Sequence, residues 1–313
     1  MANSSDILVL LLEGLTLDSP GAALSTFLIV LFAYTFVLLS NVTITLLILL
    51  NHSLHQPLYL LYLNLSFNDL LSNTLIIPRL LADLLRAPSL RTIHLYSCVI
   101  QAFLTHLTSA AGHTILMIMA FDRYVAICKP LQYSALMTGR TVVRLVVWAW
   151  GVAFIFVAVL IGLTLRLTRC RTLVSGLYCN NAELFKLSCE NTYINNIYGL
   201  FFTVVLLSSS MGSMVLTYSK IMVICLRSKN ASLNRRALQT CSTHLLSYLV
   251  YLFDGFLIIV FHRFPNLTQE RKFITIMYHL LPSGVNPLIY GLQSNEIRRS
   301  LSLFFRLKLS KGT

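Results

Sequence analysis

The sequence contains little charge. Only 11% of its 313 residues are Asp, Glu, Lys or Arg, whereas 56% are apolar, and the mean hydropathy is +0.74. A soluble domain is normally about a quarter charged. The low charge therefore excludes the two soluble domains that the length alone would allow, and it predicts a polytopic membrane protein.

Acidic residues are the scarcer kind, with 11 against 24 Lys and Arg, so that the formal net charge is +13. An excess of positive charge suits nucleic acid, but no RNA- or DNA-binding motif accompanies it here. The basic residues instead lie in short loops between apolar runs. We therefore expect no nucleic-acid partner.

The first 20 residues contain no Lys or Arg, and their apolar run Ile7–Leu12 is far too short to span a bilayer. Because a basic n-region is missing, we expect no cleavable signal peptide. Residues 1–21 are predicted to form an extracellular tail. Asn3-Ser4-Ser5 in this tail matches the N-glycosylation pattern, as do the sites at Asn41, Asn51, Asn64, Asn230 and Asn266.

Three other classes of membrane protein lack their signatures. We find no inverted repeat of a transporter, no selectivity loop or charged ring of a channel, and no nucleophile beside a base, as an enzyme needs. His106 and His113 are two helical turns apart, without a Cys or carboxylate at ligand spacing. We therefore expect neither a metal site nor a cofactor.

The sequence does contain seven apolar runs, each long enough to cross a bilayer as a helix of about 20 residues. Since an open strand edge does not persist in lipid, each run is predicted to be helical. The predicted fold is an all-α bundle of seven transmembrane helices over residues 22–292, with the termini on opposite sides. The runs are Ala22–Leu50, Pro57–Leu85, Tyr96–Ile127, Val142–Leu165, Tyr193–Leu226, Arg236–Phe261 and Phe273–Leu292.

A short amphipathic eighth helix and a cytoplasmic tail are predicted for residues 293–313. Ile297, Leu301, Phe304 and Phe305 recur there at helical spacing among Arg298, Arg299 and Arg306. Such a segment suits the surface of an anionic inner leaflet.

The distribution of Lys and Arg predicts the orientation. Fourteen of the 24 fall on the side of Arg123, ten fall on the other side, and the N-terminal tail has none. The positive-inside rule therefore places the N-terminus outside the cell, in a plasma-membrane protein. Four cysteines share the outer side, where oxidation is permitted, and they allow three pairings. They are Cys98, Cys170, Cys179 and Cys189.

Several motifs together resemble one receptor family. Asp122-Arg123-Tyr124 and Asn286-Pro287-Leu288-Ile289-Tyr290 resemble rhodopsin-like G-protein-coupled receptors. Met119–Tyr133 is similar to the "MAYDRYVAICxPLxY" block of odorant receptors, with Phe121 for the usual Tyr. Leu54–Tyr59 resembles their "LHxPMY", Arg236–Leu245 their "KAxxTCxxHL" and Pro282–Gly291 their "PxxxNPxIYG". The resemblance spans nearly the whole chain, and the loop cysteines with His262-Arg263-Phe264 are most similar to class I or fish-type members.

The resemblance implies how the chain signals. It implies disulfides Cys98–Cys179 and Cys170–Cys189, and a polar cluster of Asn41, Asp69 and Asn286 that holds a sodium ion or waters. It implies that Arg123 is released when the sixth helix swings outward, so that a G protein enters the cleft. A stimulatory olfactory G protein that raises cAMP is the expected partner. The expected coupling residues are Asp122, Arg123, Tyr124, Asn286, Pro287 and Tyr290.

The ligand is expected in the outer half of the bundle. On the third helix His106, Ser109, Ala110 and His113 share one face. Tyr198, Phe202 and Ile259 are expected to face them, with Asn181 and Ala182 as a lid. In similar receptors for short carboxylic acids the residue matching Arg263 anchors the carboxylate, although Asn181 and Ala182 replace larger polar groups here.

Asp254 leaves two readings open, since it can bind the amine of a cationic or zwitterionic ligand or pair within the bundle. We therefore expect a small, water-soluble odorant that is a carboxylate or is amino-acid-like. The alternatives are a non-olfactory receptor for an amine or metabolite and, more remotely, a transporter.

Overall fold

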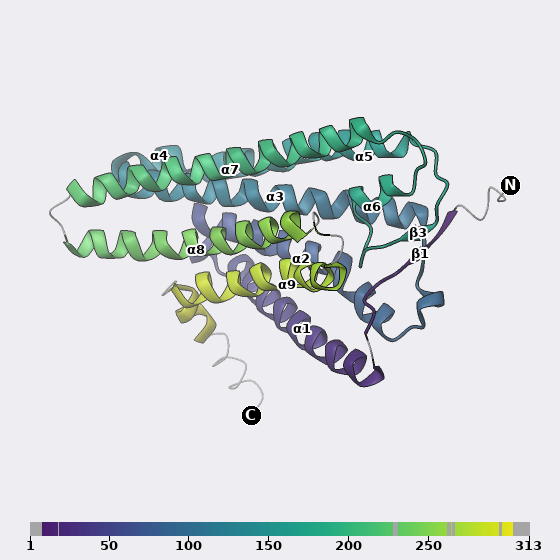
Figure 1. The fold of residues 1–313 in the computed structure, drawn as a ribbon. Coiled ribbons are helices and arrows are strands. Elements are labelled where there is room, and N and C mark those ends of the chain that lie inside the picture. The colour runs from purple at the N-terminus through teal and green to yellow at the C-terminus, as the bar shows by residue number, and fades with distance from the viewer. Residues whose placement is uncertain are drawn as a thin grey trace, which may run out of the picture.

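Seven long helices make up most of the computed structural model, which describes residues 8–17, 19–227, 231–261, 264, 267–293 and 296–302. Each predicted run lies within one of them, except that Leu85 follows the last residue of α2. α3 packs against α2, α5, α7 and α8 and is the central helix (Figure 1). The helices are α1 (Pro20–Leu50), α2 (Pro57–Leu84), α3 (Leu95–Cys128), α5 (Gly139–Leu165), α7 (Tyr193–Arg227), α8 (Ala231–Phe261) and α9 (Thr268–Gln293).

Five of these helices are long and apolar enough to cross a membrane: α1, α3, α5, α7 and Leu238–Phe261 of α8. α2 and α9 are less apolar because they contain more polar side chains, such as Asp69 and Asn286. These side chains are buried in the bundle. Large apolar side chains such as Phe32 and Trp148 are exposed instead. A helix surface that is apolar toward the outside is what a lipid environment requires.

Local sequence sets the helix ends. Pro occupies the first turn of α1 and α2, where its missing N–H costs nothing. The Ser19 hydroxyl accepts from the Ala22 amide, and Thr138 does the same for Thr141. Pro78 in α2 and Pro287 in α9 lie inside helices, which membrane bundles tolerate.

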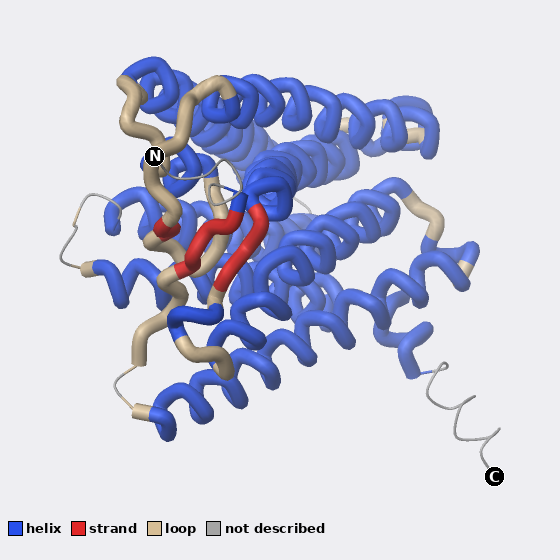
Figure 2. Tube along the Cα trace, turned by 90° about the vertical axis from the view of Figure 1, so that its right-hand side faces the viewer, coloured by secondary structure: helices blue, strands red, loops and turns tan. Residues whose placement is uncertain are grey.

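The N-terminal tail forms a small sheet at one end of the bundle, which we call the disulfide end because Cys98–Cys179 lies there. β1 (Val9–Leu12) pairs antiparallel with β2 (Thr92–His94) and parallel with β3 (Leu173–Val174) (Figure 2). No strand is predicted from the sequence for this tail, because its partners lie about eighty or more residues away. These strands lie outside the spanning runs, so the argument against strands in lipid does not apply to them.

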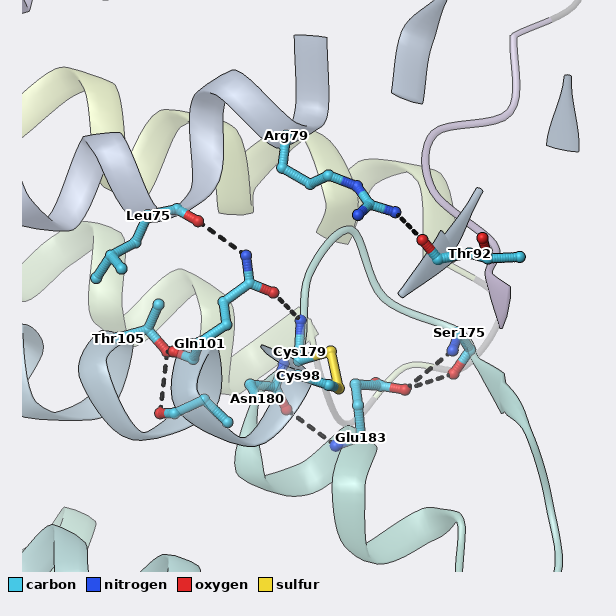
Figure 3. Close-up of a disulfide and its surroundings, with 11 residues drawn as sticks. Leu75, Arg79, Thr92, Cys98, Gln101, Thr105, Ser175, Cys179, Asn180 and Glu183 are labelled. Carbon is cyan, nitrogen blue, oxygen red and sulfur yellow. Dashed lines mark hydrogen bonds between the residues drawn. A yellow bond between two sulfur atoms is a disulfide. The ribbon is translucent and has the colours of Figure 1, made fainter. Parts of the chain in front are cut away.

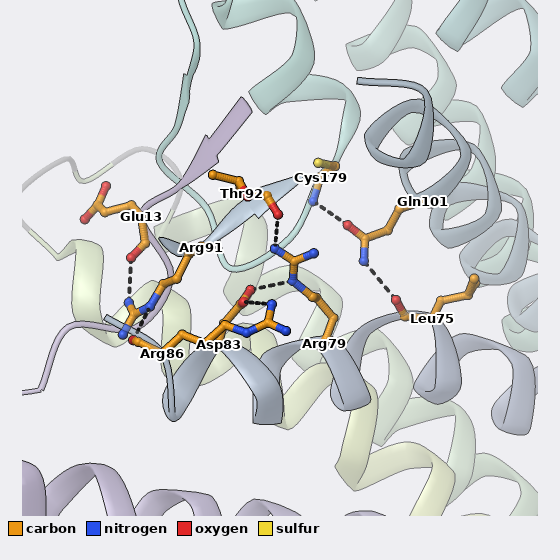
Figure 4. Close-up of polar contacts among 9 residues, drawn as sticks. All are labelled: Glu13, Leu75, Arg79, Asp83, Arg86, Arg91, Thr92, Gln101 and Cys179. Atoms are coloured by element: carbon orange, nitrogen blue, oxygen red, sulfur yellow. Dashed lines mark hydrogen bonds and ion pairs between the residues drawn. The ribbon is translucent and has the colours of Figure 1, made fainter. Parts of the chain in front are cut away.

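Two basic side chains, Lys272 and Arg91, hold the end of β1, and Figure 4 shows Arg91 with Glu13. Lys272 of α9 is only 2% exposed, and its Nζ lies 2.7 Å from Oε1 of Glu13. Arg91 Nη1 donates to the carbonyl oxygens of Glu13 at 2.9 Å and Leu15 at 3.1 Å. The chain turns there at Gly14, whose φ of 65° favours glycine. The tail is therefore anchored to α9 and to the loop between α2 and α3.

The short amphipathic helix after α9 is described only in part. Residues 296–302 are helical, and Ile297 is buried in the core cluster of α2 and α3. Glu296 accepts a hydrogen bond from the Tyr59 hydroxyl of α2. Phe304, Phe305 and Arg306 lie outside the described residues.

The alternation of buried and exposed residues along β1 supports a stability prediction. Leu10 is fully buried, whereas its neighbour Val9 is 39% exposed. Leu10→Ala should destabilise the tail sheet by about 2–5 kcal/mol, the usual cost of a buried Leu→Ala change. Proteolysis of the tail in purified receptor measures this, with Val9→Ala as the control. Equal protection of the two variants would contradict the buried position of Leu10.

Gly112 on α3 supports a second prediction. A Cβ atom there would lie 2.5 Å from the hydroxyl oxygen and 3.0 Å from Cζ of Tyr251 on α8. Gly112→Ala should therefore destabilise the α3–α8 contact by about 1–3 kcal/mol through overpacking. Thermal unfolding of the purified receptor measures the loss. Gly151→Ala on α5 is the matched control, since a Cβ there meets no atom within 4 Å; an equal effect of both changes would argue against this contact.

Candidate functional site

The long loop between α5 and α7 is fixed over the disulfide end of α3 (Figure 3). Cys98 is bonded to Cys179 and Cys170 to Cys189, the two pairings that the resemblance implies. Gln101 of α3 bridges two segments: its Nε2 donates to Leu75 O of α2 at 2.8 Å, and its Oε1 accepts from the Cys179 amide at 2.9 Å. The loop therefore enters the bundle at a defined position.

Directly after Cys179 the loop forms the short helix α6 (Asn181–Lys186). Asn180 caps it by accepting from the Glu183 amide at 2.9 Å. Glu183 is buried, which disfavours its charge, but the Lys186 ammonium and the Ser175 hydroxyl hold the pKa of its carboxyl below the usual range. The expected lid is thus a capped and charge-neutralised helix.

The lid contacts the predicted ligand face of α3. The backbone N–H of Asn181 donates to Nε2 of His106 at 3.2 Å. The Asn181 side chain points elsewhere, because its Oδ1 accepts from Thr164 of α5 at 2.7 Å, and Asn195 of α7 donates to the same hydroxyl at 3.1 Å. Ala182 follows in α6 and is half-buried. The structure therefore brings His106, Asn181 and Ala182 together.

Below His106, a chain of polar contacts crosses α3, α7, α8 and α9. Ser109 lies 2.7 Å from the Tyr278 hydroxyl of α9. His113 Nδ1 lies 3.3 Å from the Ser210 hydroxyl of α7, and its ring meets the Tyr251 ring edge-on with centroids 4.8 Å apart. The Tyr251 and Tyr278 rings are 5.8 Å apart. Ser109 and His113 thus belong to one network.

The remaining predicted ligand residues do not belong to this polar network in the described part of the chain. Ala110 packs in an apolar cluster with Phe202. Tyr198 donates its hydroxyl to Phe156 O of α5 at 3.1 Å, so it faces α5 rather than α3. Ile259 is 37% exposed and takes no part in the polar network. Arg263 and Asn3 lie outside the described residues.

Asp254 of α8 is 5% exposed, and its Oδ2 atom has no hydrogen-bond partner among the described residues. It lies close enough to Tyr278 to interact electrostatically with that hydroxyl. The pairing within the bundle that the sequence also allowed is therefore not seen in the described part of the chain. Asp254 instead adjoins the network that contains Ser109.

A polar core joins α1, α2 and α9 deeper in the bundle. Asn286 Nδ2 donates to Oδ2 of Asp69 at 2.9 Å, and Asn41 Nδ2 donates to Ser283 O at 3.0 Å. Asn73 Nδ2 donates to Ser283 Oγ at 2.8 Å. The amide oxygens of Asn41 and Asn73 are buried without a partner in the described part of the chain. Oxygen atoms around a carboxylate are suitable ligands for a hard cation or for water.

The opposite end, which we call the Arg123 end, contains the charged pair. Asp122 is fully buried, and its Oδ2 accepts from Nη2 of Arg123 at 2.5 Å and from Nε at 3.1 Å. Its Oδ1 accepts from the Tyr133 hydroxyl at 2.8 Å. Burial and the Asp122 charge raise the pKa of that tyrosine, so it remains a donor. Arg123 is therefore folded back and held on its own helix.

Aromatic contacts extend from this pair to the neighbouring helices. Lys220 Nζ of α7 lies 5.7 Å from the ring centre of Tyr124. The Tyr218 hydroxyl of α7 is hydrogen-bonded to Nδ1 of His244 on α8. The His244 ring lies 6.4 Å from the Tyr290 ring. Pro287 lies inside α9 one turn before Tyr290.

Several residues of these clusters are not predicted from the sequence, among them Tyr278, Tyr251, Ser210 and Gln101. Each is a polar residue in an apolar helix, and that is the signal that could have found them. Among the described residues, no group of three His, Cys, Asp or Glu could hold a metal ion.

Comparison with known proteins identifies the family. The sequence model of the olfactory receptors matches residues 30–308. Olfactory receptor-like protein COR6 of Gallus gallus is 32% identical over 294 residues, 93% of each chain. Olfactory receptor 4B13 of Mus musculus is 29% identical over 309 residues, 98% of this chain and 99% of that protein. Olfactory receptor 51D1 of Homo sapiens is 34% identical over 280 residues, 87% and 85% of the two chains. The chain belongs to the olfactory receptor family of G-protein-coupled receptors, which are receptors and not enzymes.

Proposed function

We propose that this olfactory receptor binds a small, water-soluble odorant between its helices and activates a stimulatory olfactory G protein, which raises cAMP. The disulfide end is the extracellular side, with the N-terminus outside, and the Arg123 end faces the cytosol. The receptor acts in the plasma membrane of olfactory neurons, at their cilia. The motifs around its loop cysteines favour a class I or fish-type member.

The observation that carries this proposal is the restrained state of Arg123. Its guanidinium is bound to a buried carboxylate whose second oxygen is held by Tyr133. Such a charge cannot bind a partner until the pair opens. Contacts of Tyr218 with His244 hold α7 and α8 together beside it. Movement of α8 would break the Tyr218–His244 contact and give a partner access to Arg123, and a ligand shifts that equilibrium by binding one packing better than the other.

The odorant occupies the space below α6, at the level of His106 and Ser109. It is a carboxylate or an amino-acid-like molecule, with Arg263 as the anchor of the carboxylate. The polar core transmits the change to α9: Asp69, Asn286 and the unpaired amide oxygens of Asn41 and Asn73 hold waters or a sodium ion in the resting state. Pro287 and Tyr290 form the movable part of α9.

Expression of the chain with a stimulatory olfactory G protein tests the proposal. Cells are exposed to carboxylic acids, amines, amino acids and alcohols, and cAMP is measured. A response to one of these classes supports the function. If the receptor reached the cell surface and no class raised cAMP, while another olfactory receptor responded in the same cells, the proposal would fail.

Changes at the charged pair should alter signalling in opposite directions. Asp122→Asn weakens the hold on Arg123 and should raise basal cAMP several-fold, because couplings of about 1–3 kcal/mol separate such states. Arg123→Ala should abolish the response to any agonist while surface expression persists. Lys129→Ala is the matched control, since Lys129 is an exposed cation at the same end. Normal basal and stimulated cAMP in both Asp122→Asn and Arg123→Ala would contradict the assigned roles.

Arg263 supports a separate prediction, which depends on the sequence alone. Arg263→Ala should raise the half-maximal concentration of carboxylic acids by about 10- to 100-fold, the value of a charge-assisted hydrogen bond. Alcohols of the same length should be unaffected. Arg166→Ala removes an exposed cation at the same end and serves as the control. Unchanged responses to carboxylates at normal surface expression would rule out the anchor.

A further inference from the structure

Buried acids in this chain are otherwise neutralised. Among the described residues, five acidic side chains are buried, and four of them have partners of suitable charge or polarity. Asp69 Oδ2 accepts from Asn286 Nδ2 at 2.9 Å. Asp83 Oδ2 lies 2.7 Å from Nε of Arg79. Asp122 and Glu183 pair with Arg123 and Lys186. The fifth, Asp254, has neither a cation nor an amide against it in the described part of the chain.

Asp254 lies on the face of α8 that points into the bundle. Ser247, Tyr251 and Asp254 recur at spacings of four and three residues and are all buried, so they share the interior face of α8. Seven residues separate Asp254 from Phe261, about 10 Å along the helix. Tyr278 connects this face to Ser109 of α3. Asp254 therefore lies in the same part of the bundle as the predicted odorant site.

An uncompensated carboxylate at this depth is costly, and a ligand that supplies the missing positive charge would remove the cost. The surroundings fit an organic cation better than a metal ion. A hard metal ion needs several oxygen ligands, whereas the neighbours of Asp254 on its own face and on α9 are the aromatic residues Tyr251 and Tyr278. A carboxylate beside aromatic rings is suited to an ammonium group.

We propose that Asp254 is the binding site for a protonated amine, so that the odorants of this receptor are alkylamines or amino-acid-like molecules whose ammonium group contacts the Asp254 carboxylate. This inference rests on the proposed function and makes an ammonium group, rather than a carboxylate, the charge that the ligand must carry. A simple carboxylic acid would leave Asp254 without a partner. The Tyr278 hydroxyl, which lies 2.7 Å from that of Ser109, is a second group beside Asp254 that can accept from the ammonium.

The test uses linear primary amines, ω-amino acids, carboxylic acids and alcohols of matched chain length on the full-length receptor. Asp254→Asn keeps the size of the side chain and removes its charge. It should raise the half-maximal concentration of amines by about 10- to 100-fold and leave alcohols unchanged. Glu270→Gln is the matched control: Glu270 is an exposed acid in the first turn of α9, so it reports only the general attraction of cations to that end.

A second variant and a binding measurement keep the test independent of folding and signalling. Asp254→Glu retains the charge on a side chain one methylene longer, so the preferred amine should become shorter. Amines should raise the unfolding temperature of purified wild-type receptor and of Asp254→Glu, but not of Asp254→Asn.

The outcomes separate the two proposals. Unchanged amine potency in Asp254→Asn would overturn the amine site. The amine site would also be overturned if amines neither activated nor stabilised the wild-type receptor while acids or alcohols did. That result would still support the proposed function. Amines that stabilise the wild type through Asp254 but never raise cAMP would support the amine site and count against the proposed coupling.

Discussion

A bilayer interior contains no water to solvate a charge, so each buried ionic group must be compensated by another part of the chain or by a ligand. This constraint organises both ends of the bundle. At the Arg123 end, the carboxylate of Asp122 is satisfied by its neighbour on α3 and by Tyr133 in the following loop. At the disulfide end, Lys272 is almost completely buried because Glu13 of the tail reaches it. Pairing of charges therefore decides where loops and tail are attached.

The same constraint explains the modest asymmetry of positive charge along the chain. Many basic residues of the disulfide end have structural partners: Arg79 and Arg86 contact Asp83, Lys186 contacts Glu183, and Arg91 donates to tail carbonyls. Such cations are neutralised or used as hydrogen-bond donors. These structural roles account for part of the ten Lys and Arg residues that lie on this side of the predicted bundle.

The helices could be predicted from the sequence because hydropathy depends on the residues of each run alone. α8 and α9 nevertheless begin five residues earlier than predicted, at Ala231 and Thr268 instead of Arg236 and Phe273. The added turn of α9 contains Glu270, Arg271 and Lys272, and hydropathy excludes it because it detects the lipid-embedded part of a helix rather than its ends. Lys272 is paired there with Glu13, a contact between residues 259 positions apart.

Some residues of the candidate site could also be predicted from the sequence, whereas others could not. Motif resemblance was sufficient to single out Arg123 and Asn286, because these residues stand in continuous sequence blocks. Tyr251 and Tyr278 stand in no such block, and their importance comes from contacts with α3 residues more than 140 positions away. Helical spacing places His106, Ser109 and His113 on one face of α3 but could not show that Tyr198 donates its hydroxyl to α5. A face of one helix can be derived from periodicity, whereas the residue opposite it depends on packing.

α8 is the element through which the two ends can communicate. Its Tyr251 lies against Gly112 and His113 of α3, and its His244, two turns away, is bonded to Tyr218 of α7. A rigid helix that has contacts at both Tyr251 and His244 transmits a shift at one of these residues to the other. This requires two stable arrangements of α8 in the bundle. Asp254, which has no cation against it in the described part of the chain, is also on α8. An ammonium ligand would change the energy of α8 directly, whereas a ligand held only by α3 would act on it through Ser109 and Tyr278.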